Sequence, residues 1–94
     1  MVRPRKPRFL RGNPTSYYFK PQGIPMRVLE EVDLWADEFE AIKLHDYDKL
    51  SQIDAAQKMK ISQPTFARVL DKAYKKIAIA LVEGKAIKID RRKG

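Results

Sequence analysis

Two polar side chains in the segment after Ser62 have the chemistry to read DNA bases, because each can make paired hydrogen bonds with a base edge. Arg68 suits guanine and Gln63 suits adenine, while the small Ala67 permits close approach or contact with a thymine methyl group. We expect Gln63, Ala67 and Arg68 to contact base edges. The candidates for the DNA phosphates are Ser51, Gln52, Thr65, Lys72 and Lys75.

Two helix starts joined by a tight turn must position these side chains. Ser51 and Ser62 can each cap a helix, because a serine hydroxyl accepts an otherwise unpaired backbone N–H of the first turn. Pro64 fits the first turn of the second helix, where a missing N–H costs little, and residues 59–61 leave room only for a sharp corner. The apolar side chains expected to meet between the helices are Ile53, Ala56, Met59 and Ile61 on one side and Phe66, Val69 and Leu70 on the other. This pattern predicts a helix-turn-helix whose second helix enters the DNA major groove; the alternative is a structural corner without a ligand.

The second helix is predicted to run from Gln63 to Gly84, well past the roughly three turns that a groove needs. Ala73 is expected to lie on the same inward face of this helix as Phe66, Val69 and Leu70. Residues 77–82 are apolar nearly all round the helix. We expect them either to pack on the aromatic N-terminal segment or to form a dimer interface.

A first helix is predicted over Asp33 to Asp46, with Asp33 or Asp37 as its cap. Its expected inward side chains are Leu34, Phe39 and Ile42, and its expected outward side chains are Glu38, Glu40 and Lys43. The acidic outer face should point away from a duplex, because phosphates would repel it.

Two short segments, Arg27–Glu31 and Ala86–Asp90, are expected to form a small β-strand pair, within one chain or between two. The aromatic residues of the N-terminal segment are Tyr17, Tyr18 and Phe19. We expect these rings to cover the helical core, and stacking on nucleic-acid bases is the alternative.

The net charge of +8 is unevenly distributed. Residues 21–50 carry three basic and eight acidic side chains, whereas residues 51–94 carry eleven basic and four acidic ones. Residues 1–16 are expected to be a basic, proline-rich arm, and residues 17–94 a single helix-turn-helix domain with its core at residues 50–83. The arm residues that could follow phosphates or enter the minor groove are Arg3, Arg5, Lys6 and Arg8. The alternative for the arm is a solvated tail.

Several function classes have little support in the sequence. Without cysteine there is no disulfide or thiolate metal site, and no apolar run approaches the roughly 20 residues that cross a bilayer, so we expect a cytoplasmic protein without a membrane contact. His45 is the one histidine and has no plausible nucleophile beside it, while Asp46 and Asp48 alone would make a poor metal cage. We therefore expect no enzyme activity, no cofactor and no metal.

Several motifs along the chain, taken together, resemble a known family. They are Tyr18-Phe19-Lys20-Pro21-Gln22-Gly23-Ile24-Pro25, the run from Asp37 to Asp46, Leu50-Ser51-Gln52, Ala55-Ala56, Met59, the run from Ser62 to Arg68, and the run from Leu81 to Ile87. The chain resembles uncharacterised protein family two-five-one (domain of unknown function one-three-four), small prokaryotic proteins described as predicted DNA-binding. The resemblance implies a helix-turn-helix similar to region four of sigma factors and to winged-helix-like regulators, and a role in transcription. Some relatives carry additional cysteines, so a metal or redox function would not transfer to this chain.

These observations predict a mainly α fold: a helix-turn-helix, three-helix domain of the winged-helix-like or sigma-region-four-like kind, with a long final helix and a small β-strand pair. The predicted function is sequence-selective binding of double-stranded DNA as a homodimer that regulates transcription. One alternative is a protein-interaction adaptor that touches RNA polymerase through the acidic face of residues 37–46. Another is RNA binding, with the N-terminal aromatic rings stacked on bases.

Overall fold

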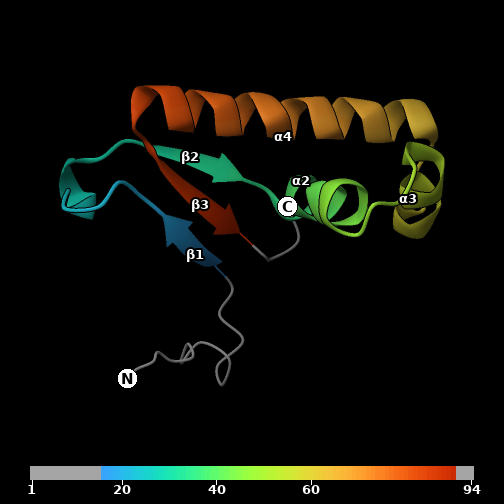
Figure 1. The fold of residues 1–94 in the computed structure, drawn as a ribbon, viewed down its shortest axis with the longest axis horizontal. Helices are drawn as coiled ribbons and strands as arrows, with labels where there is room; N and C mark the ends of the chain where they lie inside the picture. The colour runs from blue at the N-terminus through green and yellow to red at the C-terminus, as the bar shows by residue number, and fades with distance from the viewer. Residues whose placement is uncertain (1–15, 91–94) are drawn as a thin grey trace, which may run out of the picture.

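Helix α4 (Gln63–Glu83) is the longest element of the structure and joins its two parts (Figure 1). The computed structural model describes residues 16–90, so the predicted arm residues Arg3, Arg5, Lys6 and Arg8 lie outside the described part of the chain. Helix α3 (Gln52–Met59) packs against the first half of α4, and a small sheet lies along its second half (Figure 1). The predicted mainly helical fold with small β-strands is confirmed.

The sheet has three strands in the order β1-β3-β2: β1 (Ser16–Phe19), β3 (Ala86–Asp90) and β2 (Glu31–Leu34). The central β3 pairs antiparallel with β1 and parallel with β2. The predicted strand Ala86–Asp90 is therefore confirmed, and it pairs within one chain. Its predicted partner at Arg27–Glu31 is wrong, because Met26–Val28 forms a 3-10 turn instead and the strand starts at Glu31.

Strand β1 was not predicted, and it places the aromatic segment at an edge of the sheet. Tyr18 and Phe19 are exposed rather than buried, so the expectation that the rings cover the helical core is wrong for these two residues, while the Tyr17 side chain lies outside what the structure describes. Their ladder partners on β3, Lys88 and Ile87, lie about 70 residues away in the chain, a separation that local sequence patterns do not reveal.

The first helix begins later than predicted. Asp33 and Leu34 belong to β2, and α2 spans Ala36–Ile42 before continuing as a wider π-type turn, η2 (Lys43–Tyr47). Neither predicted aspartate caps α2. The carboxylate of Glu38 instead accepts the backbone N–H of Trp35 at 2.8 Å, which satisfies a free donor at the helix start.

The helix-turn-helix arrangement of α3 and α4 has the predicted caps. The Ser51 hydroxyl accepts the Asp54 N–H at 3.0 Å, and the Ser62 hydroxyl accepts the Thr65 N–H at 3.2 Å. Lys60 ends α3 in a left-handed conformation, with φ of 62°, and this turns the chain sharply toward α4. Gly84 ends α4 in the same way, with φ of 71°.

Two apolar clusters hold the elements together on one face of α4. Phe66 and Leu70 pack with Ala55 and Ala56 of α3, and the small alanines allow close approach of the two helices. Further along α4, Ala73 packs with side chains of β2 and β3. One predicted core residue is wrong: Ile53 is 60% exposed, whereas Ala55 and Ala56 on the same helix are buried.

Within residues 16–90, no helix is long and apolar enough to cross a membrane.

Candidate nucleic-acid interface

The outward side of the first three turns of α4 is open to solvent. Gln63 and Arg68 are exposed and Ala67 is half-buried, and the three predicted base-reading residues lie within one six-residue stretch of a single helix. Gln63 and Ala67 are four residues apart and therefore lie on the same side, one turn above the other. No described part of the chain covers Gln63 or Arg68, which leaves this helix side accessible to a partner.

A hydrogen bond between two glutamines links the starts of α3 and α4. The Gln63 amide group donates to the side-chain oxygen of Gln52, with Nε2 and Oε1 2.9 Å apart. The bond fixes the orientation of the Gln63 amide and leaves its Oε1 and second N–H unused by Gln52. Sequence reasoning assigned Gln52 to phosphates and missed this pairing. The sequence feature that could have indicated this pairing is the matched position of the two glutamines, each one residue after a serine cap.

The predicted phosphate ligands lie at both helix starts and farther along α4. The Ser51 hydroxyl and the Thr65 side chain already take part in the caps, since Thr65 Oγ1 accepts the Ser62 hydroxyl at 2.9 Å. The Lys75 ammonium lies 3.2 Å from an Asp71 carboxylate oxygen, and both side chains are largely exposed. Such an exposed pair contributes little to stability, so Lys75 can exchange partners at small cost.

Two basic side chains on the exposed part of α4 are not engaged in ion pairs with other described residues. Considering residues 16–90 alone, Arg68 and Lys72 have no ion-pair partner. Sequence reasoning did not select Lys49, which is exposed and stands two residues before the Ser51 cap with φ of 67°. Its left-handed conformation is visible only in the structure, so no feature of the sequence marked it, and we add it to the phosphate candidates.

Hydrogen bonds below α4 hold the interface in place. His45 Nδ1 donates to the Leu50 carbonyl at 2.8 Å, and its ring meets the Phe66 ring edge-on. The Tyr74 hydroxyl donates to the Asp46 carboxylate at 2.6 Å. Partial burial of Tyr74, together with this bond, raises its pKa from 10.0 to about 12. These contacts tie α4 to the η2 turn and the residues after it.

Glu38 does not lie on the outer face as predicted. It is 4% exposed, and its carboxylate lies 2.7 Å from the Lys76 ammonium of α4. The same ammonium donates to the Asp33 carbonyl at 2.8 Å and lies over the Trp35 ring. The acidic outer face of α2 therefore consists of Asp37 and Glu40. Glu38 instead connects α2 to α4 through its ion pair with Lys76.

The two aspartates weighed as a metal cage already have partners in the protein. Asp46 accepts the Tyr74 hydroxyl, and Asp48 lies 2.9 Å from the Lys43 ammonium, which raises the pKa of Lys43 through this hydrogen bond. In the described part of the chain, no group of three or more potential ligands could hold a metal ion.

Comparison with known proteins places the chain in a family. The model of the family described as protein of unknown function DUF134 matches residues 1–92. The UPF0251 protein of Caldanaerobacter subterraneus subsp. tengcongensis is 51% identical over 90 residues, which cover 96% of this chain and 76% of the relative. The UPF0251 proteins of Thermoanaerobacter pseudethanolicus and Halothermothrix orenii are 48% and 50% identical over 90 residues, covering 76% and 67% of those proteins. No solved structure matches this chain. The resemblance seen in the motifs is thus confirmed, and the chain belongs to the DUF134 family, whose curated relatives carry the name UPF0251 protein.

Proposed function

We propose that this protein binds double-stranded DNA selectively and regulates transcription in the cytoplasm, with the start of α4 in the major groove. One observation carries the proposal. The outward side of α4 from Gln63 to Lys75 is solvent-exposed and rich in polar and basic groups, while its inward side is buried on α3. A helix held in this way, after a short turn, is the arrangement that presents side chains to base edges.

The Gln52–Gln63 hydrogen bond gives the proposal a specific base. An adenine edge offers one acceptor and one donor in the major groove, which the free N–H and Oε1 of Gln63 match. Gln52 would act as a positioning residue, because it holds the amide in one orientation. Arg68, with its guanidinium free, suits guanine at a neighbouring position.

Phosphate binding is supported by the charge near this face. Lys49 precedes α3, and Lys72 and Lys75 follow the reading residues along α4. Lysines on both sides of a groove contact set the register of a protein on DNA without reading sequence. Each phosphate neutralised should make the slope of log affinity against log salt concentration more negative by about 0.9.

Selection of bound sites from random duplexes tests the proposal directly. We expect an enriched motif that contains adenine beside guanine. The Gln63→Ala variant should lose the preference at the adenine position, and Gln52→Ala should weaken that preference while general affinity remains. Gln57→Ala is a matched control, since Gln57 is an exposed glutamine on the same helix as Gln52. Failure to enrich any duplex sequence at moderate salt would contradict the proposal.

RNA binding is a second candidate, favoured by the exposure of Tyr18 and Phe19 on β1. Exposed rings on a sheet can stack on unpaired bases. Competition between duplex DNA and single-stranded RNA, with the Tyr18→Ala variant, separates the two candidates. Loss of RNA binding in this variant, with duplex binding absent, would favour RNA.

An adaptor role through RNA polymerase would use the remaining acidic face of α2. Its test is Asp37→Lys combined with Glu40→Lys, because Glu38 is buried and cannot meet a partner. Loss of a protein partner in this variant, while duplex binding is intact, would support the adaptor.

A further inference from the structure

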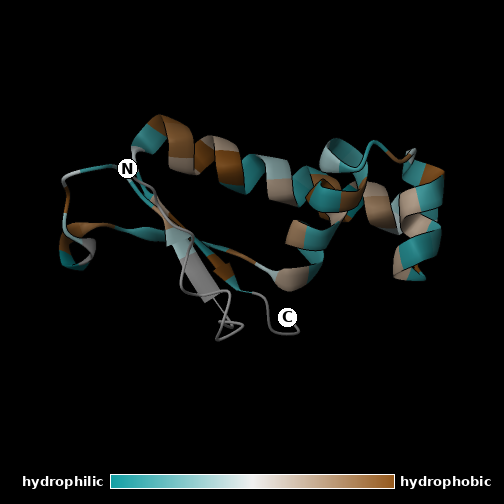
Figure 2. Cartoon of the chain, turned by 60° about the horizontal axis from the view of Figure 1, so that its bottom comes forward, coloured by the Kyte–Doolittle hydropathy of each residue, from teal (hydrophilic) through white to brown (hydrophobic). Residues whose placement is uncertain are grey.

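The last two turns of α4 expose apolar side chains that touch little of the described chain. Residues 77–82 contain no charged group, and Leu81 and Val82 are 74% and 84% exposed. Ile79, one turn from Val82 on the helix, is also exposed. Figure 2 shows this apolar colour gathered at the end of α4 beside the sheet. Water-exposed apolar side chains grouped in this way mark an interaction surface.

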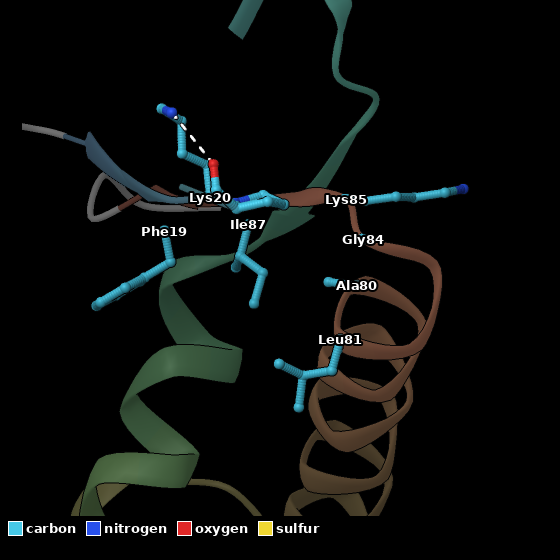
Figure 3. Close-up of a pocket in the computed structure, with 8 residues that line it drawn as sticks. Phe19, Lys20, Ala80, Leu81, Gly84, Lys85 and Ile87 are labelled. Atoms are coloured by element: carbon cyan, nitrogen blue, oxygen red, sulfur yellow. Dashed lines mark hydrogen bonds between the residues drawn. The ribbon is translucent and has the colours of Figure 1, made fainter. Parts of the chain in front are cut away.

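A small hollow lies beside Leu81, which forms part of its wall (Figure 3). It has a volume of about 220 Å³, and its apolar wall comes from Phe19 of β1, Ile87 of β3 and Ala80 and Leu81 of α4. Small-molecule sites are usually about 300–1,000 Å³ and carry converging polar groups. The size and the apolar wall of this hollow instead suit one or two apolar side chains.

The surface carries both a projection and a hollow, which makes it complementary to itself. In a two-fold dimer, a patch meets the same patch on the second copy, so a projecting side chain of each copy can enter the hollow of the other. We propose that two copies of this chain associate through the end of α4, with Leu81 and Val82 of each copy against the hollow of its partner.

The charges around the patch favour a second copy over other occupants. Lys20 and Lys85 stand at the hollow, while Glu30 and Glu83 each lie within 3.1 Å of the Lys85 ammonium. The rim therefore has both signs, and a two-fold contact can place a lysine of one copy near a glutamate of the other. DNA would gain nothing from an apolar patch with carboxylates at its rim.

The position of the patch also fits paired DNA half-sites, and this one argument rests on the proposed function. Ala67 and Val82 are fifteen residues apart, which is about 22 Å along a helix. Two such helices in line, meeting at Val82, place the reading residues about 45 Å apart before the spacing between the two helices is added. Inclined helices bring them to the 34–36 Å that separates half-sites one helical turn apart.

Sedimentation equilibrium of the full chain over a range of concentrations tests the proposal. We expect a concentration-dependent monomer–dimer equilibrium. Leu81→Glu combined with Val82→Glu should raise the dissociation constant at least about tenfold. Both side chains are largely exposed, so the monomer should keep its circular dichroism spectrum and melting temperature. Tyr47→Glu is the matched control, because Tyr47 is 78% exposed on the opposite part of the molecule and should leave the dimer intact.

The results separate this proposal from the proposed function. A wild-type chain that stays monomeric overturns the dimer. This holds whether the chain's own N-terminal arm covers the patch or the patch stays exposed to solvent. A dimer that survives the double glutamate substitution forms elsewhere and overturns this interface. Duplex binding is measured separately on a single half-site, so a dimer without duplex binding refutes only the proposed function, and a monomer that binds the half-site refutes only the dimer.

Discussion

The first three turns of α4 and its last two turns bury one continuous face but present different chemistry to solvent. The outward side of the first part carries Gln63, Arg68 and Lys72, whereas that of the last part carries Ile79, Leu81 and Val82. The inward residues, from Phe66 to Ala80, have the same small or apolar character throughout. Packing therefore sets the inward side along the whole helix, and the outward side is free to differ. We interpret the difference as two partners: a polyanion for the first part and a second copy for the last.

The substitution with the largest expected effect removes a buried side chain from the inward face that both parts of α4 share. Phe66→Ala should lower the free energy of unfolding by about 3–5 kcal/mol, because the ring is fully buried between α3 and α4 and leaves a cavity. Urea unfolding followed by circular dichroism measures this. Both DNA binding and dimer formation should fall together as the folded fraction falls. A loss below about 1 kcal/mol would show that the two helices do not depend on this contact.

Lys76 stands where the two parts of α4 meet, and its removal should have the next largest effect. Lys76→Met leaves the Glu38 carboxylate buried without its cation, so we expect a loss of about 3 kcal/mol in unfolding free energy. Adding Glu38→Gln should restore part of that loss, since the uncompensated charge disappears. Urea unfolding of both variants is the measurement. Equal stability of the single and double variants would contradict a buried ion pair.

Arg68→Ala should affect the first part of α4 alone. We expect a loss of about 1–3 kcal/mol in affinity for the selected duplex and a relaxed preference at one guanine position. Fluorescence anisotropy with labelled duplex measures the affinity, and sedimentation should show an unchanged dimer. Arg27→Ala is the matched control, because Arg27 is exposed and lies near the sheet, away from the start of α4. Equal losses of affinity in the two variants would contradict base reading by Arg68 and would indicate only a general attraction to phosphate.

Tyr74 gives the smallest expected effect and a distinctive pH dependence. Its folded pKa of about 12 lies above the ordinary value of 10.0, so the stabilisation it supplies is complete below about pH 10 and is lost as the pH rises from 10 toward 12. Tyr74→Phe should cost about 0.5–1 kcal/mol at neutral pH and should flatten this decline. Tyrosinate absorbance of the wild type should show a tyrosine that ionises near pH 12 and that is missing from the variant. An unfolding free energy that changes with pH in the same way in wild type and variant would contradict the Asp46 hydrogen bond.

The sequence by itself determined the local features of this protein. Ser51, Ser62 and Gly84 set the helix ends through contacts within one turn, and these were predicted correctly because the interacting groups are neighbours in the chain. The choice of Gln63, Ala67 and Arg68 as base-reading residues stays a prediction, and the exposure of Gln63 and Arg68 is compatible with it.

Only the tertiary structure decided which residues meet across long separations. Glu38 is buried because Lys76, 38 residues later, supplies its cation, and Asp33 and Leu34 are a strand because β3, more than 50 residues later, supplies their hydrogen bonds. The Gln52–Gln63 bond likewise depends on the crossing of two helices. Ion pairs and strand hydrogen bonds form between residues that are close in space but distant in sequence. The neighbours of a residue in the sequence therefore do not specify its partner.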